Sequence, residues 1–289
     1  MKKIAKVLFA TTAAILISAF LAPMVYKLLP MFKFEKVLNR LLMISIVMVC
    51  FFFVRFDKKL FESFGFQKKI FSIRNLIFGF FLSVVVLFVL VLAELKIGAL
   101  HLSESFEITS RPVIFSILTA VVVGLSEEFL FRGYLYSNLK KTASVFWALV
   151  WTNLIYSSAH FLKSGRPMIE GTPTMWDALR VIGASFQAFT QFTDVWPGFL
   201  GLFLFGLVLS SAFLRTKTLF LSIGIHSGAV FFLKLTSKWF EFVPTYSSFI
   251  YGGKGFYSGV LGWVFICLIG VFSCLISAKN QTYFKAKIS

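Results

Sequence analysis

Two adjacent glutamates and an arginine interrupt an otherwise apolar stretch, and they are the first residues whose types and spacing could do chemistry. Glu128 and Arg132 are four positions apart, so on a helix they would stack on one face and form a charge-assisted pair. Adjacent helical residues point about 100° apart, so Glu127 cannot share that face. A carboxylate without a local partner in an apolar site suits a general base or acid acting on water. The alternative is a buried ion network that only holds helices together.

A histidine ends the next apolar stretch, and a polar stripe leads to it. Asn153, Tyr156 and His160 are separated by steps of three and four, so they share one helical face. A hairpin turning around residues 140–144 would place Glu127 and His160 at similar depth, about 20 to 24 Å from the turn. His226, in a later stretch, would lie about 14 Å deep, and tilt or kinks can absorb the difference. One carboxylate and two imidazoles in one cavity would form a hydrolytic site.

The elements that must position these residues are membrane-spanning helices. The chain is 58% hydrophobic and only 14% charged over 289 residues, which excludes a soluble enzyme, a disordered chain and a secreted disulfide scaffold. A spanning helix needs about 20 mostly apolar residues. We therefore predict an all-α, polytopic membrane protein with about eight transmembrane helices, at residues 4–29, 37–54, 75–98, 112–139, 143–162, 197–214, 218–235 and 257–276.

The stretch at residues 177–194, the first segment and the cysteines are the remaining features of the expected layout. Residues 177–194 carry polar side chains at helical spacing, which favours an amphipathic or partly inserted helix. The first segment, although it follows Lys2 and Lys3, is predicted to be an uncleaved anchor. The three cysteines lie in apolar runs and are expected to be buried thiols: Cys50, Cys267 and Cys274.

The charge balance bears on orientation and partners. The net charge is +17, and the basic residues are interpreted as loop anchors that meet anionic lipid, with no nucleic-acid partner. With eight spans and the N-terminus inside, 17 of the 29 Lys and Arg residues fall on the inner side. The positive-inside rule then predicts that both termini are cytoplasmic, in a membrane that is expected to be the bacterial inner membrane.

The order of these motifs resembles a known family. Glu127, Glu128 and Arg132, then Tyr156 and His160, and finally His226 are similar to the CAAX protease and bacteriocin-processing (CPBP, also called Abi) family of intramembrane proteases, to which the type II CAAX prenyl endopeptidases belong. The resemblance covers roughly residues 112–235, and the eight-span count is also similar. We therefore expect motif-free helices in 1–111, a catalytic core in 112–236, and a last loop and helix in 237–289, all within one membrane domain.

The resemblance implies an intramembrane endopeptidase and a role for each site residue. Glu127 would activate water, and Glu128 with Arg132 would support it. His160 and His226 would position the water or stabilise the oxyanion. Tyr156 and Asn153 are expected to be supporting residues. The substrate would be a peptide or protein in or at the membrane, with the lipid bilayer as the other partner.

Two positions depart from the family pattern. The family usually has Phe where this chain has Tyr156, which keeps the ring and adds a hydroxyl group. It also usually has Asn or Asp four residues after the last histidine, where this chain has Val230. Loss of a donor at an oxyanion site can cost about 10²–10³ in rate. Asn153 is a conjectural substitute for the missing group.

Several alternatives stay open at this point. The site uses either no cofactor or a zinc ion, which would be held by Glu127, His160 and His226 with water in the fourth position. Because of Val230, the runner-up function is a catalytically inactive membrane scaffold or regulator. A third possibility is a transporter that uses these ionisable residues as a proton relay.

Overall fold

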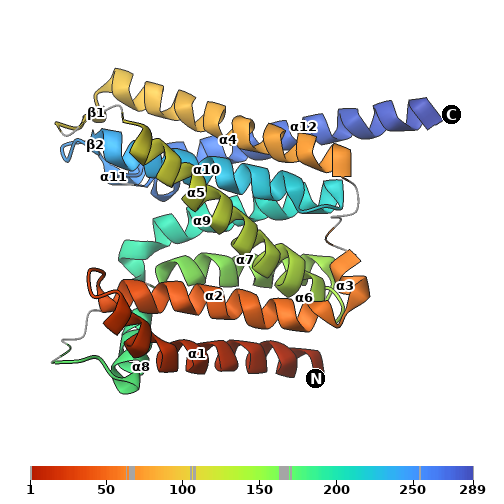
Figure 1. The fold of residues 1–289 in the computed structure, drawn as a ribbon. Helices are drawn as coiled ribbons and strands as arrows, with labels where there is room; N and C mark the ends of the chain where they lie inside the picture. Colours follow the sequence, from red (N-terminus) through yellow and green to blue (C-terminus); the bar gives the residue numbers. More distant parts are fainter. Residues whose placement is uncertain are drawn as a thin grey trace.

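The molecule is almost entirely helical, as expected (Figure 1). The computed structural model describes residues 2–62, 64, 69–104, 106, 109–162, 169, 171–253 and 255–288. All eight predicted segments form helices, with these bounds: α1 Lys2–Leu28, α2 Phe34–Arg55, α4 Lys69–Ile97, α5 Ser110–Glu128, α7 Val145–Phe161, α9 Phe192–Thr216, α10 Phe220–Trp239 and α12 Val260–Ile288. Helix α5 continues through the π-helix η1, Phe129–Tyr136, and α6, Ser137–Leu139.

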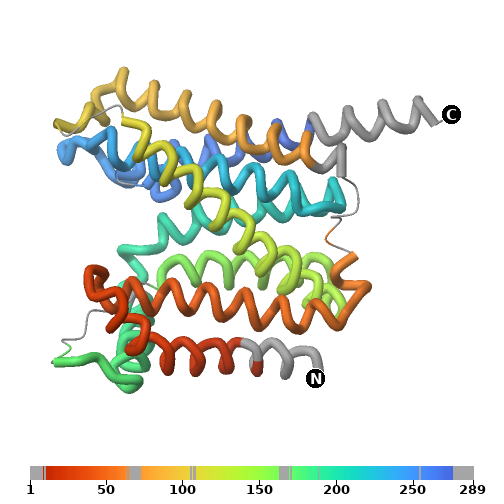
Figure 2. Tube along the Cα trace, viewed as in Figure 1, coloured from red at the N-terminus to blue at the C-terminus, as the bar shows by residue number. Residues whose placement is uncertain are grey.

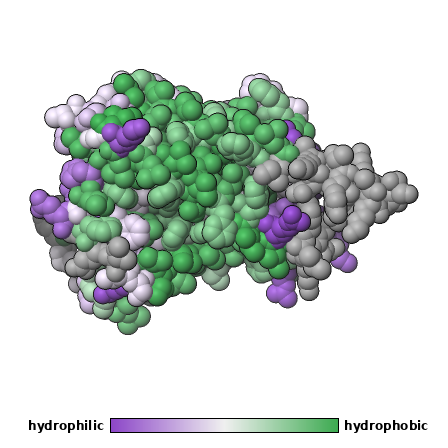
Figure 3. Space-filling model, turned by 90° about the horizontal axis from the view of Figure 1, so that it is seen from above, coloured by the Kyte–Doolittle hydropathy of each residue, from purple (hydrophilic) through white to green (hydrophobic). Residues whose placement is uncertain are grey.

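Six helical stretches of the described chain are long and apolar enough to cross a membrane. They are Thr11–Leu28, Phe34–Arg55, Ile73–Ile97, Ser110–Leu139, Met175–Thr216 and Phe220–Trp239. Of the other two predicted spans, α7 has 17 residues, and the described apolar part of α12 is Val260–Leu275. Figure 3 shows apolar residues covering the middle of one face, with hydrophilic residues gathered toward its two ends. The protein is therefore an all-α polytopic membrane protein.

The region 177–194 differs from the single amphipathic helix that we expected. It consists of α8, Met175–Ala184, then a 3₁₀ segment η2, Ser185–Gln191, and then the start of α9. Thr174 caps α8 in a reciprocal capping box with Asp177. Helix α9 also begins five residues before the predicted start, and Pro197 lies inside its first turns. Because proline has no backbone N–H, the intrahelical hydrogen bond from position 197 to the carbonyl group of Thr193 is absent.

One cysteine prediction was wrong. Cys50 is buried and Cys274 is partly buried, but Cys267 is exposed. Its neighbours on α12, Val264 and Leu268, are also exposed. An apolar side chain needs no protein partner when the surrounding solvent is lipid, so a position in an apolar run does not by itself imply burial.

The short connections add elements that the periodicity did not predict. Strands β1, Leu100–Leu102, and β2, Phe240–Phe242, pair antiparallel with His101 opposite Glu241. They join the loop after α4 to the loop after α10 at one end of the bundle (Figure 1). The remaining short helices are α3 Lys58–Glu62, α11 Ser248–Tyr251 and η3 Phe256–Ser258.

Helix α10 is the centre of the packing and brings the later histidine to the glutamates. It contacts α4, α5 and α9, and α5 crosses the bundle obliquely in Figure 2. Its two glycines Gly224 and Gly228 lie directly against the α4 backbone, at the carbonyl groups of Leu76 and Phe80. Across α10, Gly124 of α5 lies against Ser227. Small residues at these points let three backbones approach closely, which places His226 beside the end of α5.

This close approach gives a stability prediction. Replacing Gly224 with Ala would drive a Cβ into the backbone of Leu76, which cannot rotate away, so we expect α4 and α10 to separate. The expected loss is about 1–3 kcal/mol of unfolding free energy, measured in detergent. Gly183→Ala on α8 is the matched control, because a Cβ there meets no atom within 4 Å. Equal stability of the two variants would contradict the packing argument.

Candidate active site

The predicted motif of Glu127, Glu128 and Arg132 lies across a change from α-helix to π-helix. Helix α5 ends at Glu128, and the following residues, including Arg132, form the π-helix η1. The N–H of Phe129 is shared between the carbonyl groups of Leu125 and Ser126 at this junction. π-Helical turns are rare and frequently occur at functional sites. The two glutamates therefore lie on regular α-helix, and the arginine lies one turn into the wider helix.

Glu128, Arg132 and His226 form a buried network of charge-assisted contacts. Arg132 donates from Nη1 to Glu128 Oε1 over 2.9 Å, as the spacing of four predicted. The same Oε1 is also 2.9 Å from His226 Nδ1. Arg132 and Glu128 are completely buried, and the His226 side chain is only 1% exposed. A buried charge without partners is costly, so burial of each of these three side chains depends on its contacts with the others.

The arginine is held from two further helices. Its Nη2 donates to the carbonyl oxygen of Gly206 over 2.9 Å and to Asn153 Oδ1 over 3.3 Å. Asn153 also accepts from Ser210 through Oδ1 and donates from Nδ2 to the carbonyl oxygen of Leu149. Asn153 is thus positioned to support Arg132.

The Tyr156 ring packs against the arginine and both histidines of the site. The Arg132 guanidinium lies over its ring at 4.7 Å from the centroid, which is a cation–π arrangement. The ring also contacts His160, with centroids 4.6 Å apart, and lies 6.1 Å from the His226 ring. This residue therefore contacts both the buried arginine and the more accessible histidine, His160.

Glu127 faces both histidines, as predicted. Its Oε2 lies 3.5 Å from His160 Nε2 and 3.7 Å from His226 Nε2. These distances are ion-pair contacts but too long for direct hydrogen bonds, and Oε2 is buried without a hydrogen-bond partner. Glu127 is 19% exposed and His160 is 29% exposed. The site is thus sealed around His226 and accessible at Glu127 and His160.

The hydrogen-bond network assigns the histidine tautomers. His160 Nδ1 lies 2.9 Å from the carbonyl oxygen of Tyr156, which can only accept, so Nδ1 carries the proton. His226 Nδ1 faces a carboxylate that is paired with Arg132, so it also carries the proton. When neutral, both rings then present an Nε2 lone pair toward Glu127. Three acceptor atoms converge, and a proton donor such as water would satisfy them.

The structure also shows contributors that the sequence analysis missed. Gly206 and Ser210 are four positions apart on α9 and face the Arg132–Asn153 pair. The signal was present as two small residues at helical spacing in an apolar helix. Phe205, next to Gly206, contributes a ring 5.7 Å from that of His226. Val230 lies one turn beyond His226 on α10 and is partly buried.

Zinc binding by Glu127, His160 and His226 stays a prediction. Across the described residues, no group of three His, Cys, Asp or Glu side chains is arranged so that it could hold a metal ion. Glu127, His160 and His226 are donors that zinc accepts, and Glu127 Oε2 lies 3.5 Å and 3.7 Å from the Nε2 atoms of His160 and His226. The chemistry proposed below uses these side chains alone.

Comparison with known protein families gives a match for the middle of the chain. Residues 109–232 match the family model described as type II CAAX prenyl endopeptidase Rce1-like, which confirms the resemblance predicted from the sequence. The match contains all seven predicted site residues. Comparison with curated proteins gave no match, and comparison with solved structures gave none either.

Proposed function

We propose that this chain, whose residues 109–232 form a CAAX-protease-type domain, is an intramembrane endopeptidase that hydrolyses a peptide bond with water activated by Glu127. The observation that carries the proposal is the convergence of Glu127 Oε2 with the Nε2 atoms of two histidines in a partly accessible site. A family of peptide hydrolases and a carboxylate facing two imidazoles both point to hydrolysis.

In the first step, a water molecule would donate hydrogen bonds to Glu127 and to one histidine Nε2. Glu127 removes one proton as the water oxygen bonds to the scissile carbonyl carbon, and the carbonyl π electrons move onto its oxygen. A protonated histidine Nε2 would stabilise that oxyanion. His160 is the better placed of the two because its side chain is more accessible.

In the second step, the oxyanion collapses and the C–N bond breaks. The departing nitrogen takes the proton that Glu127 received, which releases the new amine and carboxyl termini and restores the carboxylate. One water is consumed and no other reactant is needed. General acid and base roles at one glutamate are consistent because the proton is taken and returned on the same side of the substrate.

Glu128 and Arg132 would act through His226. Their contact keeps a negative charge at His226 Nδ1, which holds the proton there and aims Nε2 at the Glu127 side. A carboxylate that accepts a hydrogen bond from one ring nitrogen of a histidine commonly fixes the orientation of the ring. We therefore assign Glu128 and Arg132 as positioning residues.

The substrate would be a membrane-associated peptide or protein, such as a C-terminal tail, a peptide precursor or another membrane protein. We also propose that both termini face the cytoplasm of a bacterial inner membrane. Basic residues at the end of α2 and in α3 support this orientation: Arg55, Lys58 and Lys59. A reporter enzyme that is active only on the periplasmic side can be fused to each terminus. Activity of either fusion would contradict this orientation.

The test compares cells that express the unchanged chain with cells that express Glu127→Ala at matched levels. Mass spectrometry of newly formed protein termini should reveal a terminus that disappears only in the variant. That result would establish a protease and name its substrate. If the two cell lines show the same termini, the endopeptidase proposal fails.

The alternative, an inactive membrane scaffold, is favoured by Val230. An apolar side chain one turn beyond His226 supplies no donor for an oxyanion. Introducing Val230→Asn distinguishes the two functions. A chain that is inactive until this substitution is made would support the scaffold, whereas an active unchanged chain would exclude it.

Treatment with a metal chelator gives a separate prediction. If Glu127 and the two histidines activate water without a metal ion, EDTA should leave the cleavage rate of the purified protein unchanged. The measurement is peptide cleavage before and after chelation, followed by addition of zinc. Loss of activity that zinc restores would overturn the metal-free mechanism and assign Glu127, His160 and His226 as ligands.

A further inference from the structure

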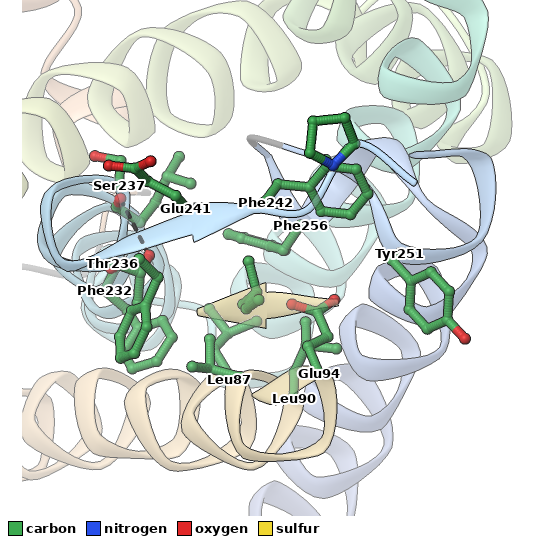
Figure 4. Close-up of a pocket in the computed structure, with 16 residues that line it drawn as sticks. Leu87, Leu90, Glu94, Phe232, Thr236, Ser237, Glu241, Phe242, Tyr251 and Phe256 are labelled. Carbon is green, nitrogen blue, oxygen red and sulfur yellow. Dashed lines mark hydrogen bonds between the residues drawn. The ribbon is translucent and has the colours of Figure 1, made fainter. Parts of the chain in front are cut away.

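A second cavity lies apart from the candidate active site. It has a volume of about 530 Å³ and is enclosed by α4, α10, the β1–β2 ribbon and the segment that contains α11 and η3 (Figure 4). This volume is in the range of small-molecule sites. The nearest lining residue along α10, Phe232, is six positions from His226, which corresponds to about 9 Å of helix. The cavity is therefore not used by the mechanism proposed above.

An acidic side chain without a partner points into this cavity. Glu94 is only 5% exposed, and its Oε1 is buried with no hydrogen-bond partner. In Figure 4 its carboxylate points away from α4 toward the β1–β2 ribbon. A carboxylate in such surroundings is costly unless it is neutralised or paired. Only 12 of the 289 residues are acidic, so a buried glutamate is an unusual feature of this strongly basic chain and indicates a specific role.

The surroundings of Glu94 favour a cation. Two helix C-termini, those of α4 at Ile97 and α10 at Trp239, end beside the cavity, and helix C-termini carry partial negative charge. Five lining residues are aromatic: Phe232, Phe240, Phe242, Tyr251 and Phe256. Aromatic faces attract ammonium groups. Among the described residues that line the cavity, none is Lys, Arg or His.

We propose that this cavity binds an organic ammonium group attached to a short apolar body. Glu94 pairs with the ammonium, and the aromatic and aliphatic walls cover the apolar part. Leu87, Leu90 and Val91 supply the aliphatic wall on α4. The ligand is either a lipid with an ethanolamine headgroup or a free amine, since both carry the same recognised chemistry. This inference stands independently of the proteolytic activity.

The test measures binding of hexylammonium and of hexanol to the full chain in maltoside detergent by saturation-transfer NMR. Hexylammonium should bind saturably to the unchanged chain and about tenfold or more weaker to Glu94→Gln, because the charge-assisted contact is lost. Hexanol has the same apolar body without the charge, so its binding should be equal in the two proteins. Equal hexylammonium binding to both proteins would overturn the proposal.

Two further variants keep the test decisive. Glu241→Gln is the matched control, because Glu241 lines the same cavity but is more than half exposed and bonds to Ser103. It should bind hexylammonium like the unchanged chain, and a loss equal to that of Glu94→Gln would overturn the role of Glu94. Ser237→Trp at the exposed rim should block binding without changing the core. Unimpaired binding to a folded Ser237→Trp chain would also count against this cavity.

The source of the ammonium group is identified by competition. Dicaproyl phosphatidylethanolamine should displace hexylammonium if the ligand is a lipid headgroup, and dicaproyl phosphatidylglycerol should not. If neither lipid competes while hexylammonium binding still requires Glu94, the ligand is a free amine. Displacement by both lipids alike would show that the site recognises acyl chains and would overturn the ammonium assignment.

Discussion

Replacing Glu127 with Gln is expected to slow peptide cleavage by about 10²–10⁴-fold, the range that a positioned general base contributes. The amide has nearly the same size and can still contact the histidines, so the loss should reflect the missing proton acceptor. Since Glu127 is partly exposed and forms no hydrogen bond through Oε2, folding should change little. The expected signature is therefore a fall in kcat with an unchanged melting temperature and little change in KM.

The measurement is cleavage of a peptide identified from cells, using purified chain in detergent or nanodiscs. Glu104→Gln is the matched control, because this glutamate is exposed in the loop after β1. The control should cleave at the unchanged rate. A Glu127→Gln chain that retains full activity would rule out glutamate-activated water, even if the protein proved to be a protease by another mechanism.

Replacing Arg132 with Met should have the largest effect on stability. Arg132 is fully buried and donates to Glu128, Gly206 and Asn153, which belong to three different helical segments. Its removal leaves the Glu128 charge buried without its main partner, and breaking a buried pair in this way costs about 3–5 kcal/mol. We expect a much lower melting temperature in detergent, together with loss of activity.

A second substitution separates the pair from the rest of the packing. In the double variant Arg132→Met with Glu128→Gln, the uncompensated charge is gone, so part of the lost stability should return. Activity should not return, because His226 Nδ1 no longer faces a carboxylate. Arg180→Met is the control, since Arg180 is mostly exposed in α8 and should matter little. If Arg132→Met is as stable as this control, the buried network does not have the structural role assigned to it.

Together the two substitutions divide the site by function. Glu127 lies at the accessible edge, where a change should affect chemistry and spare the fold. Arg132 lies at the sealed centre, where a change should affect both. Finding the reverse pattern would mean that the accessible edge is the structural part and that the reacting groups lie elsewhere.

The sequence by itself determined the features that depend on spacing within one helix. The Glu128–Arg132 pair followed from a separation of four residues, and the common face of Asn153, Tyr156 and His160 followed from steps of three and four. The eight helical segments followed from apolar length. These features are predictable because helix geometry converts sequence separation directly into direction.

Tertiary structure alone decided which helices meet and which atoms face each other. The bond from His226 to Glu128, the contact of Arg132 with Gly206, and the isolation of Glu94 in its cavity each join or separate residues far apart in the chain. The depth estimates for Glu127 and His226 differed, yet the two side chains meet. Helix tilt and close approach at glycines such as Gly224 set these distances, and both depend on the packing of three or more helices at once. Spacing along one chain carries no direct record of that packing.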